Sequence, residues 1–309
     1  MKEKLVVIVG PTAVGKTSLS VQLAKRFHGE IVSGDSMQVY QEMDIGTAKI
    51  MPEEMEGVPH HLIDILKPDQ NFSVQEYQQL AREKITEITG RGHLPMLVGG
   101  TGLYIEAVVH DYAVPHVKED ISLREELHEF ARREGNKALH RRLEKVDPVQ
   151  AKKLHPNDLR RMIRALEVYY VTGKPFSKLR RKGTSPYEAL WIGLTMPREQ
   201  LYERINERVD EMIRKGLVNE VKKLWKQGYG LHLTSMQAIG YKEIVSYLQE
   251  EITLDEAIRL IKRGSRKYAK RQLSWFRRLK EIHWFDVTNP QSFREIEELV
   301  AGKFPLARE

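Results

Sequence analysis

A glycine-rich stretch near the start of the chain ends in lysine and threonine: GPTAVGKT, residues 10–17. It follows the apolar run Leu5–Val9, which has the length and composition of a buried strand. In such a loop the backbone N–H groups point at an anion, Lys16 adds a positive charge, and the Thr17 hydroxyl is placed to ligate Mg²⁺. The pattern predicts a phosphate-binding loop made of Gly10, Pro11, Thr12, Ala13, Val14, Gly15, Lys16 and Thr17.

Asp35 lies in the stretch SGDSMQVY, at the end of the second predicted strand, Glu30–Ser33. A carboxylate at this position can hold Mg²⁺ through water or accept a proton from a nucleophile that faces the phosphates. We expect Asp35 to lie beside the phosphate loop if the strands that carry the two loops are neighbours. A turn aspartate or a helix cap is the alternative interpretation.

A third polar loop, GGTGLY at residues 99–104, follows the apolar strand Pro95–Val98. The Thr101 hydroxyl in this loop could donate a hydrogen bond to a phosphate oxygen. The loop alone is a weak signal, because glycines are common in turns between a strand and a helix. Three polar loops at the carboxyl edge of one sheet are a much stronger indication of a site.

The first third of the chain alternates between strand and helix patterns, which predicts a parallel sheet covered on both faces. Apolar residues at helical spacing follow the phosphate loop, and a capping box at Ser73 and Glu76 opens a second helix. Glu188–Thr195 returns to the sheet, and His283–Asp286 is a candidate last strand. The predicted fold class is α/β, with a P-loop NTPase-like parallel sheet core, a helical insertion domain and a helical C-terminal extension.

The middle of the chain shows helical patterns alone. Residues 1–112 and 184–309 are expected to form the core with its C-terminal helices, and residues 113–183 to form a basic helical insertion. Within the insertion, a capping pattern predicts one helix that begins after Ser122, and Asp147 followed by proline predicts the start of another.

The chain of 309 residues contains no cysteine, which excludes disulfides, thiolate metal sites and cysteine nucleophiles and favours a reducing compartment. The first strand begins at Leu5, which leaves no room for a signal peptide, and no apolar run approaches the roughly 20 residues that span a bilayer. We therefore expect a cytoplasmic protein with no membrane segment.

The net charge of +7 is distributed unevenly along the chain. Residues 1–112 hold 10 basic and 15 acidic side chains, whereas residues 113–183 hold 18 basic and 10 acidic ones. Lys262–Lys280 adds nine basic residues and no acidic one. This asymmetry indicates a polyanionic partner, and solvated helix faces balanced by acids elsewhere are the alternative.

Other candidates carry less weight. The adjacent His60 and His61 have no metal-ligating partner at helical spacing, so hydrogen-bonding or core histidines are favoured. Trp275 and Phe276 on the basic helix could stack on bases, although core packing is the default.

Taken together, the motifs resemble those of the bacterial tRNA dimethylallyltransferases, the IPP transferase family. The similar stretches are, in order, GPTAVGKT, GDSMQVYQEMDIGTAK, GVPHHLID, LVGGTGLYI, NDLRRMIRALEVYYVTGKP, RINERVDEMIRKGLVNEV, AIGYKE and AKRQLSWFRR. They cover nearly the whole chain and are far more specific than a single phosphate loop. The zinc-finger tails of some eukaryotic relatives are missing, as the lack of cysteine requires.

This resemblance implies that the bound phosphate is the diphosphate of dimethylallyl diphosphate. The prenyl group would pass to N6 of the adenosine at position 37, just 3′ of the tRNA anticodon, without consumption of a nucleotide. The resemblance further implies catalytic roles for Lys16, Asp35, Thr101 and Arg208, of which Arg208 matches a family arginine that faces the diphosphate. Mg²⁺ is the implied cofactor, held at Thr17 and Asp35 directly or through water.

On the acceptor side, the resemblance implies that a monomer binds the anticodon stem-loop of a tRNA and splays its bases, as is general for single-stranded RNA. The residues that it assigns to tRNA binding are Asp35, Ser36, Met37, Gln38 and Thr101 at the flipped adenosine, Arg124, Asp158, Leu159, Arg160 and Arg161 in the insertion, and Gln237, Gly240, Tyr241, Lys242, Lys270, Arg271 and Gln272 in the C-terminal helices.

Two alternatives from other classes stay open at this point. A P-loop small-molecule kinase would use the same loop for ATP and would need arginines over the transferred phosphoryl group. A nucleotide-gated RNA-binding protein would bind RNA without chemistry. An isopentenyltransferase acting on free adenylate is disfavoured, because a mononucleotide acceptor has no need of the basic insertion.

Overall fold

The computed structural model describes residues 2–110, 112–113, 117–179 and 181–305. The chain forms two compact units. The first unit comprises Met1–Val109 and Ser185–Glu309, and the second comprises His110–Thr184. The sequence predicts a division a few residues away, at 112/113 and 183/184.

The first unit is built on a six-stranded sheet with the strand order β3-β2-β4-β1-β7-β8. Every neighbouring pair in it is parallel, as the alternating sequence pattern predicts. The strands are β1 (Glu3–Val9), β2 (Gly29–Ser33), β3 (His60–His61), β4 (Leu94–Gly99), β7 (Tyr187–Thr195) and β8 (Ile282–Asp286). The predicted α/β fold class is confirmed, and the return to the sheet after the insertion occurs at β7.

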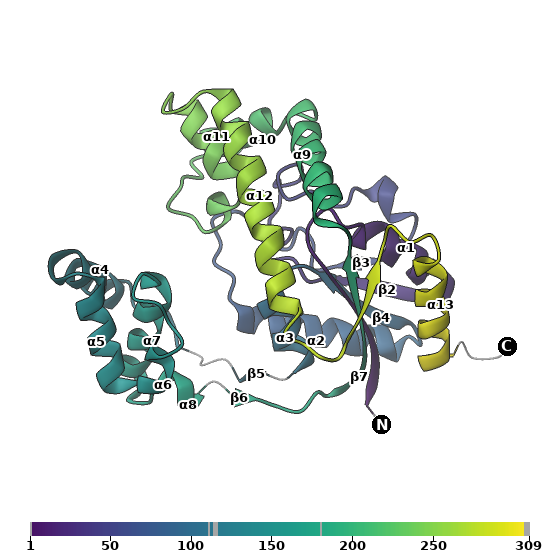
Figure 1. Cartoon of the computed structure of the whole chain (residues 1–309), viewed down its shortest axis with the longest axis horizontal. Helices are drawn as coiled ribbons and strands as arrows, with labels where there is room; N and C mark the ends of the chain where they lie inside the picture. The colour runs from purple at the N-terminus through teal and green to yellow at the C-terminus, as the bar shows by residue number, and fades with distance from the viewer. Residues whose placement is uncertain (1, 111, 114–116, 180, 306–309) are drawn as a thin grey trace. The chain divides into compact units, whose positions relative to one another are not determined.

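Eight α-helices accompany this sheet within the described residues. Their arrangement around the sheet can be followed in Figure 1. They are α1 (Lys16–Phe27), α2 (Val74–Gly90), α3 (Gly102–Val109), α9 (Arg198–Arg214), α10 (Leu217–Lys226), α11 (Tyr241–Leu248), α12 (Leu254–Phe276) and α13 (Ser292–Lys303). The capping box predicted at Ser73 and Glu76 is confirmed, with bonds in both directions. None of the helices in the described part of the chain is both long and apolar enough to cross a bilayer.

The central strand β1 is buried on both faces and sends alternate side chains into two apolar clusters. Val6 and Ile8 pack with residues of α1, α9 and α13. Leu5, Val7 and Val9 pack with residues of α2 and α3. Because successive side chains of a strand point to opposite faces, one continuous apolar run supplies both layers. A third cluster joins α9, α10, α11 and α12 to the loop that follows β2, through Val39, Tyr40 and Met43.

The second unit consists of five α-helices and a two-stranded antiparallel sheet in its described residues. These are β5 (Tyr112–Ala113), α4 (Ile121–Glu134), α5 (Asn136–Val146), α6 (Pro148–Ala151), α7 (Leu159–Thr172), α8 (Phe176–Leu179) and β6 (Arg181–Lys182). Its core is made by buried apolar side chains of α4, α5, α6 and α7, with Leu154. The predicted start after Asp147 is confirmed, because the Asp147 carboxylate accepts a bond from the backbone N–H of Gln150.

The predicted cap at Ser122 is wrong. Asp120 caps α4 instead, with its carboxylate 3.0 Å from the Leu123 backbone nitrogen, so Ser122 lies inside the helix. Serine and aspartate are both favourable N-cap residues, and the two lie two positions apart. The bond between Asp120 and the buried Glu167, whose Oε1 is 2.9 Å from the Asp120 backbone nitrogen, fixes the earlier start.

A buried carboxylate ties together the amino-terminal edges of β2 and β4. Glu30 accepts two bonds from the Arg91 guanidinium, at 3.1 and 2.7 Å, and lies 2.6 Å from a ring nitrogen of His61 and 2.7 Å from one of His93. Burial raises the pKa of Glu30, but the bonds from Arg91, His61 and His93 outweigh that effect and lower it to about 2. The prediction that His61 has a hydrogen-bonding role is thereby confirmed.

Replacement Glu30→Gln should lower the free energy of unfolding at pH 7 by about 2 kcal/mol, since it leaves partly exposed cations without a buried partner. Because the pKa of Glu30 is lower in the folded protein than its ordinary value of 4.5, its ionised form stabilises the fold. This stabilisation is fully present above about pH 4.5 and is lost as the pH falls toward 2. Urea unfolding should therefore show that the free energy of unfolding of the wild type exceeds that of Glu30→Gln by a constant amount above about pH 5. This difference should become smaller below pH 5. A difference that grows as the pH falls would contradict this.

Candidate functional site

The three polar loops lie at one edge of the sheet, at the carboxyl ends of β1, β2 and β4. The condition placed on Asp35 is not met as stated, because β4 lies between β1 and β2. The loops after β2 and β4 nevertheless touch: the Gly34 backbone nitrogen is 2.7 Å from the Val98 oxygen, and the Thr101 nitrogen is 3.3 Å from the Gly34 oxygen. A Cβ at Gly99 would lie 2.3 Å from the Gly34 oxygen, so this approach requires glycine.

The loop at residues 10–15 has the backbone of an anion-binding turn. Ala13 and Gly15 have φ values of 64° and 101°, and α1 begins at the next residue, Lys16. Lys16 Nζ donates to the carbonyl oxygens of Gly10 and Pro11, at 3.0 and 2.7 Å. The lysine therefore lies over the loop, where a bound diphosphate would take over its hydrogen bonds.

Arg208 reaches the same loop from α9. Its Nη1 lies 3.3 Å from the Thr12 hydroxyl oxygen, and its Nη2 lies 3.5 Å from the carbonyl oxygen of Ala48. Burial lowers the pKa of Arg208, and the charge of Asp35 acts in the opposite direction. The predicted position of Arg208 at the phosphate loop thus agrees with the geometry, and the site gains a second cation.

The pKa of Lys16 is strongly lowered in this site. Burial and, to a lesser extent, the charge of Arg208 lower its pKa, the charge of Asp35 raises it, and the net result is a pKa of about 7. Two cations and one carboxylate therefore share the site, and its surplus positive charge favours an anionic ligand.

Asp35 has one oxygen committed to its own loop. Oδ1 accepts from the backbone nitrogens of Met37 and Gln38, at 2.8 and 3.3 Å. The alternative interpretation, that Asp35 is a turn aspartate, therefore applies to Oδ1. Oδ2 makes no hydrogen bond with any described residue, which leaves it available to a ligand or to a proton.

The long helix α12 fastens the first and third loops together. Gln272 accepts from the Thr12 backbone nitrogen at 2.8 Å, and its amide nitrogen donates to the Gly100 oxygen at 3.1 Å. A Cβ at Gly100 would lie 2.0 Å from that amide nitrogen. Tyr268, one turn earlier, hydrogen-bonds with the side chains of Thr101 and Gln272. Both loops are therefore positioned by one helix.

The residues predicted to bind tRNA near the loops occupy different depths. Thr101 Oγ1 lies 3.2 Å from the Ser36 backbone nitrogen, which joins the second loop to the third. Gln272 is buried between loops, and Tyr241 is fully buried with its hydroxyl 2.6 Å from Glu220. The exposed members are Gln237, Lys242, Lys270 and Arg271, and Gly240 is buried at the start of α11. Direct contact of each with RNA stays a prediction.

In the second unit, the predicted tRNA-binding residues lie at the start of α7 and on α4. Arg160 is exposed, Arg161 lies 3.2 Å from Asp158, and Leu159 is the first residue of α7. Arg124 pairs with the buried Glu167 at 2.8 Å, so its guanidinium serves the packing of this unit.

Three side chains of the site were not found from sequence: Lys49, Glu220 and Tyr268. Lys49 and Glu220 organise the loop after β2, and Tyr268 supports Thr101. Lys49 stands in the quoted stretch GDSMQVYQEMDIGTAK, which is the one signal that could have singled it out. The contacts of Glu220 with residues 44–46 and of Tyr268 with Thr101 span more than 150 residues of chain, which no local pattern encodes.

The available oxygen atoms are compatible with Mg²⁺. Mg²⁺ prefers oxygen ligands and is commonly held by one or two protein groups together with phosphate oxygens and water. Thr17 is exposed on the first turn of α1, and Asp35 has its unbonded Oδ2. The described residues contain no cluster of three or more His, Asp or Glu side chains arranged to hold a metal.

Comparison with known proteins gives one family. The family model described as IPP transferase matches residues 38–279. A tRNA dimethylallyltransferase of Carboxydothermus hydrogenoformans is 57% identical over 303 residues, covering 97% of each chain. The crystal structure of a tRNA isopentenylpyrophosphate transferase from Bacillus halodurans aligns with a TM-score of 0.75 at 54% identity, covering 98% of this chain and 97% of that one. A eukaryotic dimethylallyltransferase acting on tRNA aligns with a TM-score of 0.80 at 29% identity, covering 99% and 81%.

The pKa of Lys16 leads to a prediction about donor binding. Because that pKa is about 7 in the free protein and a bound diphosphate favours the charged ammonium, binding should raise it. At pH 8 binding should take up close to one proton, and the uptake should vanish well below pH 7. Calorimetry in two buffers of different ionisation enthalpy measures this number. Lys25→Met, which removes an exposed lysine of α1, should leave it unchanged, and proton release on binding would contradict the assignment.

Proposed function

The chain belongs to the IPP transferase family, and from this premise we propose how its site transfers a dimethylallyl group from dimethylallyl diphosphate to a tRNA. The acceptor atom is N6 of the adenosine just 3′ of the anticodon. The observation that carries the proposal is the shared site of Lys16, Arg208 and Asp35, where two cations face one carboxylate at the edge that the three loops form.

The donor side of the site binds the leaving group. As the bond between carbon 1 and the diphosphate oxygen breaks, its electron pair passes to the diphosphate and the allyl carbon acquires cationic character. Lys16, Arg208 and the amides of residues 13–17 would stabilise the negative charge that develops, whereas the Thr12 amide is already bonded to Gln272. A Mg²⁺ held at Thr17, and at Asp35 through water, would supply further positive charge to the diphosphate oxygens and leave Asp35 Oδ2 without a direct metal bond.

The acceptor side positions a weak nucleophile. The lone pair of an adenine amine is delocalised into the ring, so orientation and the timing of proton removal matter more than basicity. N6 forms the new bond to carbon 1 and gives its proton to Asp35 Oδ2, the carboxylate oxygen that makes no hydrogen bond with described residues. Ser36, Met37 and Gln38 follow Asp35 and would border the flipped base.

The second unit is proposed to hold the RNA backbone. Its sequence carries 18 basic against 10 acidic side chains over residues 113–183, and Arg160 and Arg161 are exposed at the start of α7. The exposed basic residues of α12, Lys270 and Arg271 among them, add positive charge to the first unit. Phosphate contacts of this kind give affinity that depends strongly on salt.

Mass analysis of an anticodon stem-loop RNA tests the proposal. After incubation with the protein, dimethylallyl diphosphate and Mg²⁺, the RNA should gain one dimethylallyl group on the adenosine 3′ of the anticodon. No ATP should be needed. An RNA of unchanged mass would contradict prenyl transfer, and turnover of labelled ATP would favour the kinase alternative.

The role of the second unit makes a separate prediction. The double replacement Arg160→Ala with Arg161→Ala should weaken tRNA binding and make the slope of log affinity against log salt shallower by about 0.7 per lost phosphate contact. The affinity for dimethylallyl diphosphate should not change.

Arg132 and Arg133 on α4 provide a matched control, because both are exposed and their replacement by alanine removes the same charge. If that control changes the salt slope as much as the α7 variant does, the effect is one of net charge. Loss of donor affinity in the α7 variant would contradict its assignment to RNA binding.

A further inference from the structure

Lys49 is a buried cation that none of the steps above uses. Its side chain is 3% exposed, and Lys49 is the least exposed lysine or arginine among the described residues. Removing an ammonium group from water is costly unless all of its donors are satisfied. Its position on the loop after β2, which also carries Asp35, calls for a role in that loop.

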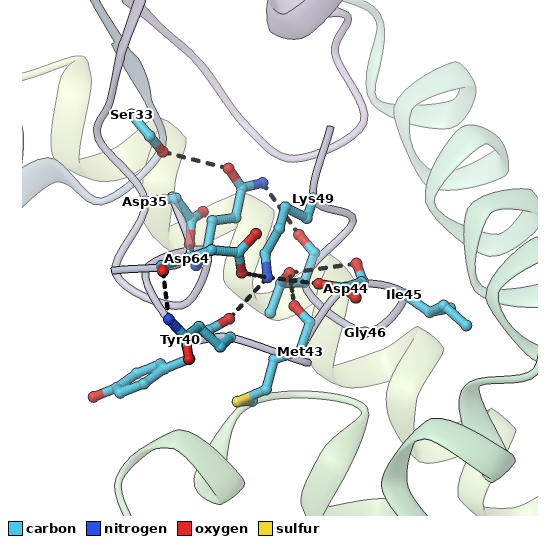
Figure 2. Close-up of polar contacts among 12 residues, drawn as sticks. Ser33, Asp35, Tyr40, Met43, Asp44, Ile45, Gly46, Lys49 and Asp64 are labelled. Carbon is cyan, nitrogen blue, oxygen red and sulfur yellow. Dashed lines mark hydrogen bonds and ion pairs between the residues drawn. The ribbon is translucent and has the colours of Figure 1, made fainter. Parts of the chain in front are cut away.

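Every donor of the Lys49 ammonium has a partner from a different part of the loop region (Figure 2). Nζ lies 2.8 Å from the Tyr40 carbonyl oxygen and 2.6 Å from the Asp44 carboxylate, and it also donates to the Asp64 carboxylate. Three donors and three acceptors match. Lys49 therefore ties the beginning, the middle and the end of segment 40–49 to the chain after β3.

These bonds continue to Asp35 through Gln38. The Asp64 backbone nitrogen lies 3.1 Å from the Gln38 carbonyl oxygen, and the Gln38 nitrogen lies 3.3 Å from Asp35 Oδ1. The Gln38 amide donates to the carbonyl oxygens of Thr47 and Ala48, both at 3.3 Å. A sequence of bonds thus leads from the Lys49 ammonium through the carboxylate and backbone nitrogen of Asp64 and the backbone of Gln38 to the carboxylate of Asp35.

The backbone on both sides of this contact is in a conformation that L-residues rarely adopt. Ala48 and Asp64 have φ values of 49° and 55°. Such residues persist where surrounding contacts over-determine the backbone, and they gather at functional sites. The Ala48 carbonyl also accepts from Arg208 at 3.5 Å, so the segment that Lys49 holds touches the diphosphate side as well.

A second anchor holds the turn of the loop from outside. The Glu220 carboxylate accepts from the backbone nitrogens of Asp44, Ile45 and Gly46, at 3.0, 2.7 and 3.1 Å. A Cβ at Gly46 would lie 2.4 Å from the ring of Tyr241, which packs directly on that glycine. The turn at residues 44–46 is thus fixed to α10 and α11. Lys49 fixes the position of the rest of the loop relative to this turn.

We propose that Lys49 is a positioning residue for prenyl transfer: its ammonium fixes the loop after β2 so that Asp35 meets the acceptor amine and Gln38 borders the base. The proposal deepens the proposed function and rests on it for its activity readout. Replacement should affect the chemical step much more than the binding of the diphosphate. Lys49 makes no hydrogen bond with the loop at residues 10–17, and the segment that it holds reaches the diphosphate side only through the 3.5 Å contact between Ala48 and Arg208.

A variant that lacks the Lys49 ammonium should still fold, because the two carboxylates that pair with it are partly exposed to water. Asp44 and Asp64 are 41% and 49% exposed, so water can solvate both carboxylates when the ammonium is removed. Lys49→Met keeps the length of the stem and removes the charge. Asp64→Asn is a second variant that keeps Lys49 and weakens one of its bonds. Lys25→Met is the matched control, because it removes an exposed lysine of the same unit.

Three quantities are measured for each variant: the single-turnover rate of prenyl transfer, the dissociation constant of dimethylallyl diphosphate, and hydrogen exchange of the amides of residues 36–49. In Lys49→Met the rate should fall by about tenfold to a hundredfold, since a small displacement of a catalytic group has that effect. The dissociation constant should stay within about twofold, and loop exchange should rise while that of α1 does not. Asp64→Asn should show smaller changes in the same direction.

An unchanged rate, or a rate that falls only as far as donor affinity does, would overturn the proposal. If Lys49→Met does not fold, the same comparison in Asp64→Asn decides. Wild type and Lys25→Met test the proposed function independently: if neither transfers a prenyl group, that function fails. The exchange measurement then still tests whether Lys49 holds the loop, and unchanged exchange would refute it.

Discussion

The parallel pairing of β1, β4 and β2 is the constraint on which the site depends. Because these strands run in one direction, the three loops that follow them leave the sheet at one edge. Gly99 lets the loops after β2 and β4 touch, since a Cβ at this position would lie 2.3 Å from the Gly34 oxygen. The buried amide of Gln272 then bonds to the first loop at Thr12 and to the third at Gly100. A helix that carries basic residues is thereby fixed to the loops that would hold the diphosphate.

Positive side chains outnumber negative ones at this edge of the sheet, where Lys16 and Arg208 face Asp35. Lys16 and Arg208 are poorly solvated, and burial lowers the pKa of each. Repulsion by Arg208 lowers the pKa of Lys16 as well, and the charge of Asp35 offsets part of both effects. An anion that enters relieves the repulsion, so the site is electrostatically incomplete without a ligand. Lys49 contrasts with them, since its three donors are already satisfied by the protein. Its charge maintains structure, whereas theirs is available for binding.

Features that depend on local sequence could be predicted. The turn at residues 10–15, the capping box at Ser73 and the return of the chain at β7 all follow from short patterns. The parallel sheet followed from their order. The position of β4 between β1 and β2 did not, because strand order is decided by crossovers that no short pattern encodes. The motif resemblance brought in Arg208, but neither it nor periodicity indicated that Glu220 would cap a turn some 175 residues away.

In the proposed mechanism, Asp35 takes the proton of the acceptor amine at a site where Lys16 and Arg208 bind the donor. The most direct test of this role is the single-turnover rate of prenyl transfer in Asp35→Asn, measured together with the dissociation constants of dimethylallyl diphosphate and of tRNA. The asparagine keeps the turn-forming Oδ1 and loses the base. The rate should fall by roughly a hundredfold or more, and both dissociation constants should change little. A rate close to that of wild type would contradict this mechanism and leave Asp35 a turn residue.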